Sequence, residues 1–128
     1  NKQYEITDWE TAEMVKYYIN TFLATKVSFA NEMKQVCAVT GIEYNEVKNL
    51  ALLDDRIGKS HLNVPGPDGY HGFGGKCFAK DLNALMHYCV SNSVRPTMLQ
   101  AAWQKNLEVR EEKDWLNIEG AVTKEIEK

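Results

Sequence analysis

The feature that most constrains the fold is the stretch 11–40, which contains neither proline nor glycine and is dense in apolar side chains. A continuous helix over these residues would be roughly 45 Å long at 1.5 Å per residue, longer than a small domain is wide. Because its apolar positions wrap most of the circumference, we expect burial on several sides, partly by a second copy of the chain. Asp8 and Thr11 are candidate N-caps, and Gly41 is a candidate C-terminal stop.

Three shorter helices are predicted after this one. Val47, Leu50 and Ala51 lie at helical spacing and indicate a helix over 44–53. A third helix is expected from about 78 until the serines at 91–93, with Leu82, Leu85, Met86 and Cys89 facing inward. Pro96 suits the first position of a fourth helix that reaches about 112. No repeat and no strand-like alternation is visible, so the predicted fold class is all-α, with a long helix packed against shorter ones.

Length and composition favour one domain. A chain of 128 residues that is 44% hydrophobic can bury a single core. We expect a helical domain over 1–112 and an extended or partly ordered tail over 113–128. The chain starts at Asn1 rather than at a methionine, which indicates a segment of a longer protein.

Charge and residue spacing exclude several functional classes. The net charge is −3, with basic and acidic residues interspersed, so no cationic stripe would attract nucleic acid. Apolar runs are far short of the roughly 20 residues needed to span a bilayer, and no leader is visible, so we expect no membrane partner and a cytoplasmic location. Three cysteines without CxxC spacing argue against a disulfide framework, and three histidines without HxxxH spacing argue against a metal site.

The segment 56–76 is predicted to be one long functional loop, because it is rich in glycine and also holds two prolines and two histidines. This loop runs into the motif GFGGKCFAKD, residues 72–81, which places Cys77 at the start of a helix with Lys76 and Lys80 nearby. The helix N-terminus and the lysines favour the nucleophilic thiolate.

Other interpretations of this motif stay open. Cys77 could instead be a small buried hydrophobic residue, a role that fits Cys37 and Cys89 better. The GFGG sequence lacks the spacing and the preceding strand of a dinucleotide fingerprint. Its glycines could let backbone amides approach a sugar or a phosphate closely.

Polar residues elsewhere in the chain could serve the same site. Lys16 and Asn20 are four residues apart on one helical face, where they could stabilise an oxyanion, although Lys16 could also extend to solvent. Asp81, one turn after Cys77, could orient a water, balance a lysine or complement the helix dipole. Arg56 follows two aspartates and could pair with them.

Three motifs, KYYINTFLATKVSFANE, DDRIG and GFGGKCFAKD, occur in this order and spacing over about residues 12–86. Together they resemble the central segment of the UDP-glucose and GDP-mannose dehydrogenase family. In that family a Rossmann domain binds NAD, and a helical central domain, similar to the C-terminal domain of 6-phosphogluconate dehydrogenase, mediates dimerisation. The resemblance implies a homodimerising central domain with the Rossmann domain absent, and an isolated chain that is inactive.

The resemblance also implies a reaction: the 6-hydroxyl of a nucleotide sugar, preferably UDP-glucose, is oxidised to a carboxylate with two NAD. Cys77 matches the cysteine that forms a thiohemiacetal and then a thioester. Lys16 and Asn20 match residues that support the reacting oxygen, and Asp81 matches an aspartate linked to proton transfer. Lys80 falls on the nicotinamide side, and the matching substrate contacts are Arg56 (reaching the neighbouring subunit), Leu62, Asn63, Gly72, Phe73 and Gly74.

Two alternative functions stay open. The substrate could be GDP-mannose or another UDP-sugar, or the chain could be a helical dimerisation module without catalysis. The joint presence of the cysteine, lysine, asparagine and aspartate argues against a pure scaffold. Ala79 departs from the family pattern, in which many members have proline, and the segment 63–71 is longer than in the animal enzymes.

Overall fold

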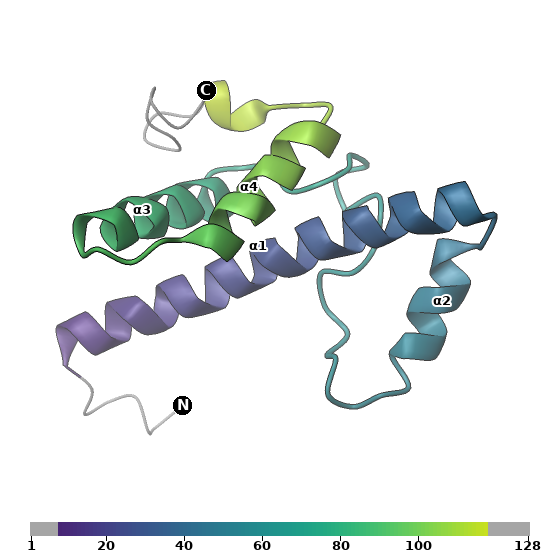
Figure 1. Cartoon of the computed structure of the whole chain (residues 1–128), viewed down its shortest axis with the longest axis horizontal. Helices are drawn as coiled ribbons and strands as arrows, with labels where there is room; N and C mark the ends of the chain where they lie inside the picture. The colour runs from purple at the N-terminus through teal and green to yellow at the C-terminus, as the bar shows by residue number, and fades with distance from the viewer. Residues whose placement is uncertain (1–7, 118–128) are drawn as a thin grey trace.

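The computed structural model describes residues 8–117, and all of the regular elements among them are helices. Its elements are α1 (Trp9–Thr40), α2 (Tyr44–Ala51), α3 (Cys77–Ser91), α4 (Thr97–Val109) and the short 3₁₀ helix η2 (Asp114–Asn117). In Figure 1, α1 runs the length of the molecule, α3 and α4 lie on one side of it, and α2 folds back beside its C-terminal end. The predicted all-α fold, with one long helix packed against shorter ones, is confirmed.

The ends of α1 are set by its flanking residues. The Asp8 carboxylate accepts a 2.8 Å hydrogen bond from the Thr11 amide, as an N-cap does. Gly41 adopts a left-handed conformation with φ of 72°, which ends the helix. Asp8 and Gly41 are confirmed in the predicted roles, whereas Thr11 lies inside the helix and donates to the cap.

The shorter helices differ from prediction at their ends. Helix α2 ends two residues early, and α3 begins at Cys77, one residue early. Pro96 occupies the N-cap of α4 rather than its first helical position. Helix α4 ends at Val109, short of 112, because Arg110 is extended, with φ of −75° and ψ of 120°. Tertiary contacts of the Arg110 side chain, described below, account for this early end.

The main core lies where α1, α3, α4 and η2 meet. Ala24, Leu82 and Trp103 belong to this cluster, and Trp115 of η2 completes it at 1% exposure. The Trp103 and Trp115 ring centroids are 5.1 Å apart. Trp115 falls in the segment 113–128 that was expected to form a tail, so the packed domain extends at least through η2. Residues 118–128 lie outside the described residues.

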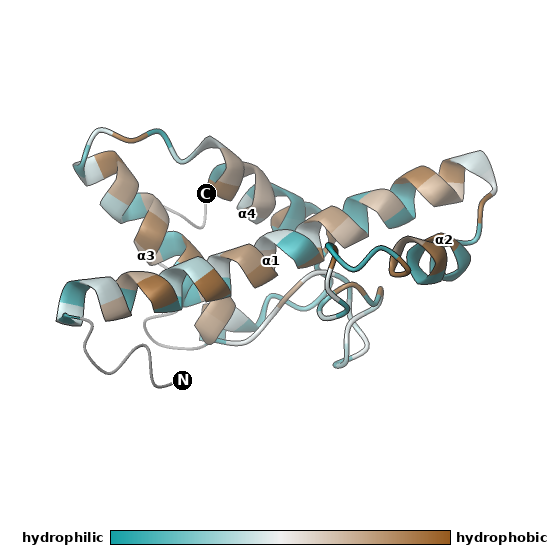
Figure 2. Ribbon diagram, turned by 90° about the horizontal axis from the view of Figure 1, so that it is seen from below, coloured by the Kyte–Doolittle hydropathy of each residue, from teal (hydrophilic) through white to brown (hydrophobic). Residues whose placement is uncertain are grey.

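Helix α1 buries small and polar residues against its neighbours. Ser28 donates a 2.7 Å hydrogen bond to the Ala102 carbonyl of α4, and Ala30 is 1% exposed. Large side chains remain on its surface within this single chain, with Phe22 and Phe29 more than half exposed. Viewed from below in Figure 2, hydrophobic residues recur along α1. A single chain therefore leaves uncovered many of the apolar positions that the sequence pattern predicts to be buried.

A second, smaller core joins α2 and the long loop to the C-terminal half of α1, with Ala30, Cys37, Tyr44 and Val64 as its buried members.

Within residues 8–117, no helix is both long enough and apolar enough to traverse a bilayer.

Candidate functional site

A polar cluster connects α1 and α3 across the helix interface. Asp81 of α3 is 2% exposed, and its Oδ2 accepts a 2.6 Å hydrogen bond from Asn20 Nδ2 of α1. The Nζ of Lys16, one turn earlier on α1, lies 3.7 Å from Asp81 Oδ1, and the Lys16 side chain is half exposed. Three of the four residues predicted to be catalytic thus meet, because a spacing of four residues puts Lys16 and Asn20 on the same side of α1.

Cys77 is the first residue of α3 and lies one helical turn before Asp81. Its side chain is exposed, whereas Cys37 is buried and Cys89 is half-buried; all three thiols are free. The buried hydrophobic role considered for Cys77 does not fit this exposure. The sequence also leaves the N-terminus of α3 without a side-chain cap, because Lys76 at the cap position makes no capping hydrogen bond. An accessible thiol therefore lies beside uncapped helix amides, which carry partial positive charge.

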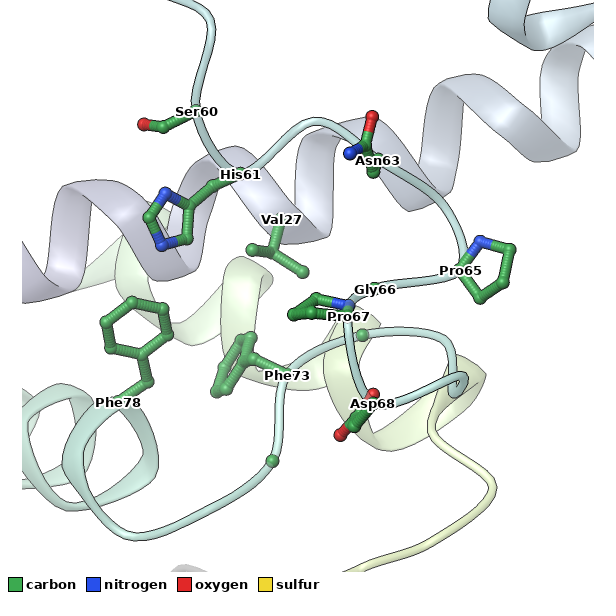
Figure 3. Close-up of a pocket in the computed structure, with 12 residues that line it drawn as sticks. Val27, Ser60, His61, Asn63, Pro65, Gly66, Pro67, Asp68, Phe73 and Phe78 are labelled. Atoms are coloured by element: carbon green, nitrogen blue, oxygen red, sulfur yellow. The ribbon is translucent and has the colours of Figure 1, made fainter.

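A cavity of about 490 Å³ opens beside the start of α3 (Figure 3). On one side the ring centroids of His61 and Phe78 lie 5.6 Å apart, and those of Phe73 and Phe78 lie 6.0 Å apart. The opposite wall is formed by the segment 65–68. Four of the predicted substrate contacts line the cavity: Asn63, Gly72, Phe73 and Gly74.

The other two predicted substrate contacts, Leu62 and Arg56, do not line it. Leu62 is half-buried against the smaller core, where its carbonyl accepts a 2.7 Å hydrogen bond from the Tyr44 hydroxyl. Arg56 forms two side-chain hydrogen bonds to Asp54, of 2.9 and 2.6 Å, and these hold the pKa of Asp54 below its usual value. The alternative pairing of Arg56 with an aspartate is therefore present in the single chain, and its proposed reach into a neighbouring subunit stays a prediction.

The glycine loop is anchored by residues that the sequence interpretation missed. Asn106 of α4 is 0% exposed; its Oδ1 accepts from the Phe73 amide at 2.7 Å and its Nδ2 donates to the Phe73 carbonyl at 3.0 Å. Asn31 of α1 accepts from the Gly72 amide at 3.2 Å. Gly72 has φ of 68°, and a Cβ there would overlap Asn106 Oδ1, so only glycine fits.

Arg110 holds the same loop from the end of α4. Its guanidinium donates to Asp68 Oδ2 at 2.8 Å, to the His71 carbonyl at 3.3 Å and to the Glu112 carbonyl at 2.7 Å. The hydrogen bond from Arg110 lowers the pKa of Asp68. The spacing in the sequence could have indicated these two residues. Asn106 and Arg110 follow Ala102 at intervals of four residues, which is the spacing of one helical face, and Ala102 is buried.

The predicted cofactor contact, Lys80, is exposed in the first turn of α3. Across residues 8–117, no group of three or more histidine, cysteine or acidic side chains is arranged to hold a metal ion.

Comparisons with known proteins identify the family. Residues 10–108 match the model of the UDP-glucose/GDP-mannose dehydrogenase family, central domain. The chain is 43% identical over 103 residues to UDP-glucose 6-dehydrogenase of Rickettsia bellii, covering 80% of this chain and 23% of that protein. It is 38% identical over 100 residues to UDP-glucose 6-dehydrogenase TuaD of Bacillus subtilis, covering 78% of this chain and 21% of that protein.

A third relative gives the same result. UDP-glucose 6-dehydrogenase AglM of Haloferax volcanii is 40% identical over 95 residues, which are 74% of this chain and 21% of that protein. The chain thus spans less than a quarter of the length of each of these relatives. Because the family model covers most of the four-helix domain, including Cys77, Lys16, Asn20 and Asp81, this chain belongs to the UDP-glucose/GDP-mannose dehydrogenase family and contains its central domain.

Proposed function

We propose that this chain is the substrate-site domain of an NAD-dependent UDP-glucose 6-dehydrogenase, which oxidises the sugar 6-hydroxyl to a carboxylate in two steps. The observation that carries the proposal is the cluster of Lys16, Asn20 and Asp81, one helical turn from the exposed Cys77 and close in sequence to the cavity wall. The relatives' names supply UDP-glucose as the preferred substrate. GDP-mannose and other UDP-sugars remain the alternatives.

Each polar residue has a role in this chemistry. The Sγ of Cys77 adds to the aldehyde carbon of the half-oxidised sugar to give a thiohemiacetal, and the thioester formed on further oxidation is hydrolysed by water. Asn20 uses one amide proton on Asp81 and has a second, while the half-exposed Lys16 has three donors, so both can also stabilise the developing oxyanion. Asp81 can accept the proton of the attacking water.

The cavity suits a sugar nucleotide. Its volume of about 490 Å³ lies within the range of small-molecule pockets, roughly 300–1,000 Å³. Aromatic rings of Phe73 and Phe78 provide apolar area, while Asn63 and Asp68 supply polar groups at the opposite side. Phe73 cannot offer its own amide to a ligand, because Asn106 occupies it.

NAD fits this chain only at its edge. The described residues form no strand, so the βαβ unit that holds a dinucleotide is not among them. Lys80 is exposed on the same turn of α3 as Cys77, where it can attract a pyrophosphate or orient a nicotinamide. When bound, NAD accepts the hydride in both oxidations. The free thiols fit a reducing compartment, and we place the protein in the cytoplasm.

We also propose that a second copy of the chain covers α1. Phe22 and Phe29 are exposed on α1, and an apolar groove of about 340 Å³ separates this helix from α2. Met33, Val47 and Ile57 also line the groove. Exposed apolar surface of this kind is typical of an interface between subunits.

The deciding experiment measures NADH formation by the full-length polypeptide that contains this chain, with UDP-glucose, GDP-mannose and UDP-N-acetylglucosamine in parallel. We expect UDP-glucose to give the highest kcat/KM and Cys77→Ala to abolish formation of the carboxylate product. The 128-residue chain alone should produce no NADH. Unchanged turnover in Cys77→Ala would exclude the thioester route, and absence of turnover with every sugar would favour the helical dimerisation module.

A further inference from the structure

We infer that Asn106 and Arg110 are positioning residues of the candidate site: from the end of α4 they hold residues 68–75 in the path that forms the cavity wall and leads to Cys77. Both side chains are nearly inaccessible, with Asn106 at 0% and Arg110 at 3% exposure, and neither lines the cavity. They act through the loop backbone rather than by touching a ligand. The consequence for substrate binding rests on the function proposed above, whereas the anchoring itself does not.

Asn106 fixes the loop at Phe73 by occupying both polar groups of one residue's backbone. Its amide oxygen accepts from the Phe73 N–H at 2.7 Å, and its amide nitrogen donates to the Phe73 carbonyl at 3.0 Å. Phe73 is 5% exposed, so water cannot easily replace these bonds. An unsatisfied buried amide or carbonyl is costly, and the loop therefore has one strongly preferred register against α4.

Arg110 fixes the preceding turn. Its guanidinium reaches Asp68 and the His71 carbonyl, and its Cζ lies 5.2 Å from the centroid of the Tyr70 ring. The turn is closed internally by a 2.9 Å hydrogen bond from the Gly66 amide to the Tyr70 carbonyl. Because Asp68 and Gly66 line the cavity, Arg110 sets the position of the wall opposite the aromatic rings.

The loop is held again just before the thiol. Asp114, which follows α4 in the chain, accepts from the Gly75 amide at 2.9 Å, and its Oδ2 lies 3.7 Å from Arg110 Nη2. Gly74 passes so close to the guanidinium that a Cβ on it would overlap Arg110 Nη2. The chain is thus fixed from Asp68 to Gly75, two residues before Cys77.

The first test compares Asn106→Ala with Asn83→Ala, a matched control. Asn83 is 3% exposed on α3 and donates within its own helix, to the Ala79 carbonyl at 2.8 Å. Amide hydrogen exchange is measured on the 128-residue chain under native conditions, and binding of UDP-glucose is measured on the full-length polypeptide. We expect exchange at Phe73 to rise at least about tenfold in Asn106→Ala, which corresponds to the loss of one buried hydrogen bond. UDP-glucose affinity should fall by about the same factor.

In Asn83→Ala, exchange at Phe73 and the affinity for UDP-glucose should match those of the unmodified protein, even if global stability falls. Equal exchange at Phe73 in the folded Asn106→Ala and Asn83→Ala variants would overturn the inference. Failure of the unmodified protein to bind UDP-glucose would instead contradict the proposed function. The exchange rates at Phe73 would still test whether Asn106 holds the loop.

The second test uses chemical rescue of Arg110→Ala in the full-length polypeptide. Guanidinium ion at low millimolar concentration should fill the space left by the side chain and recover part of the lost UDP-glucose affinity. Arg110→Lys should recover little, because one ammonium cannot reproduce the planar fork that serves Asp68, His71 and Glu112 together. An Arg110→Ala variant with unimpaired UDP-glucose affinity would contradict the positioning role.

Discussion

The carboxylate of Asp81 on α3 accepts a 2.6 Å hydrogen bond from the side-chain amide of Asn20 on α1. The two residues are 61 positions apart in the sequence, so this contact exists only because α3 packs across α1. Asp81 is 2% exposed and the nearby Lys16 is half exposed. The amide is therefore the shortest polar contact that the buried carboxylate makes with α1.

Removal of this amide should destabilise the fold. We expect Asn20→Ala to lower the free energy of unfolding by about 1–3 kcal/mol, because a buried carboxylate loses a hydrogen-bond donor. Urea denaturation measures the change, and Asn49→Ala, at an exposed position of α2, should alter stability by less than about 0.5 kcal/mol. In a double-mutant cycle with Asp81→Asn the two effects should be non-additive. Strict additivity would show that the contact contributes nothing.

The three cysteines should react with iodoacetamide in a fixed order. Cys77 is exposed, Cys89 is half-buried and Cys37 is 4% exposed, so we expect labelling to decrease in that order in the folded chain. A difference of at least about tenfold between Cys77 and Cys37 follows if Cys37 reacts only after local opening. Mass spectrometry of peptides measures each rate. The order should vanish in concentrated urea, and uniform slow labelling in the folded chain would contradict the nucleophile assignment.

Gly74→Ala should destabilise the chain for a steric reason. The new Cβ would overlap the guanidinium of Arg110, and overpacking of this kind costs about 1–3 kcal/mol. In an Arg110→Ala background the same change should cost clearly less, because only the close contact with Asp114 Oδ1, 2.7 Å from the added Cβ, would remain. Thermal or urea unfolding of the unmodified chain, the two single variants and the double variant measures this difference.

Gly75→Ala is the matched control for Gly74. No atom lies within 4 Å of a Cβ at Gly75, but its φ of 77° is left-handed, so we expect a cost of about 1–2 kcal/mol. That cost should be the same with and without Arg110. A Gly74→Ala penalty that also persists unchanged in the absence of Arg110 would refute the steric explanation.

The hydrogen bonds that hold the loop at His71 and Asp68 should weaken in acid. Hydrogen bonds from the His71 ring, 2.7 Å away, and from the His71 amide lower the pKa of Glu111 from 4.5 to about 2, and Arg110 lowers the pKa of Asp68. A carboxyl whose pKa is depressed in the folded state stabilises that state fully above its ordinary pKa and loses this effect as pH falls through the folded value. Amide protection at His71 should therefore decline between about pH 4.5 and 2.

Glu111→Gln should reduce this pH dependence at His71, whereas Glu46→Gln on α2 should leave it intact. Hydrogen exchange followed by NMR measures both. Identical pH profiles in the unmodified chain and Glu111→Gln would show that the hydrogen bonds between His71 and Glu111 do not hold the loop.

A charge on the exposed face of α1 should prevent self-association. If a second copy covers this helix, Phe22→Glu combined with Phe29→Glu places two carboxylates in the apolar groove and should convert a dimer to a monomer. Val39→Glu, at 86% exposure near the end of α1 and outside the groove, serves as the control. Light scattering gives the mass of each variant. A double variant that stays dimeric would place the interface elsewhere.

Local sequence patterns fixed the helices and several of their ends. The proline-free and glycine-free stretch, the Asp8 cap and the left-handed Gly41 act over one or two turns, so α1 could be predicted to within a few residues. Short-range spacing likewise placed Lys16 with Asn20 on one face and Cys77 one turn before Asp81. These relations depend only on helix geometry.

Which elements meet depends on the packing of the whole domain. Whether Asn20 faces Asp81, whether Asn106 holds Phe73 and whether Trp115 belongs to the core depend on packing between segments far apart in sequence. Helix α4 ends at Val109 because Arg110 finds its partners in the distant loop, and no local propensity encodes that choice. The sequence alone determined the helices and the chemical groups that they carry. The arrangement of the site was determined by packing, because a buried donor or acceptor without a partner is costly and the buried polar groups of the site therefore pair across the fold.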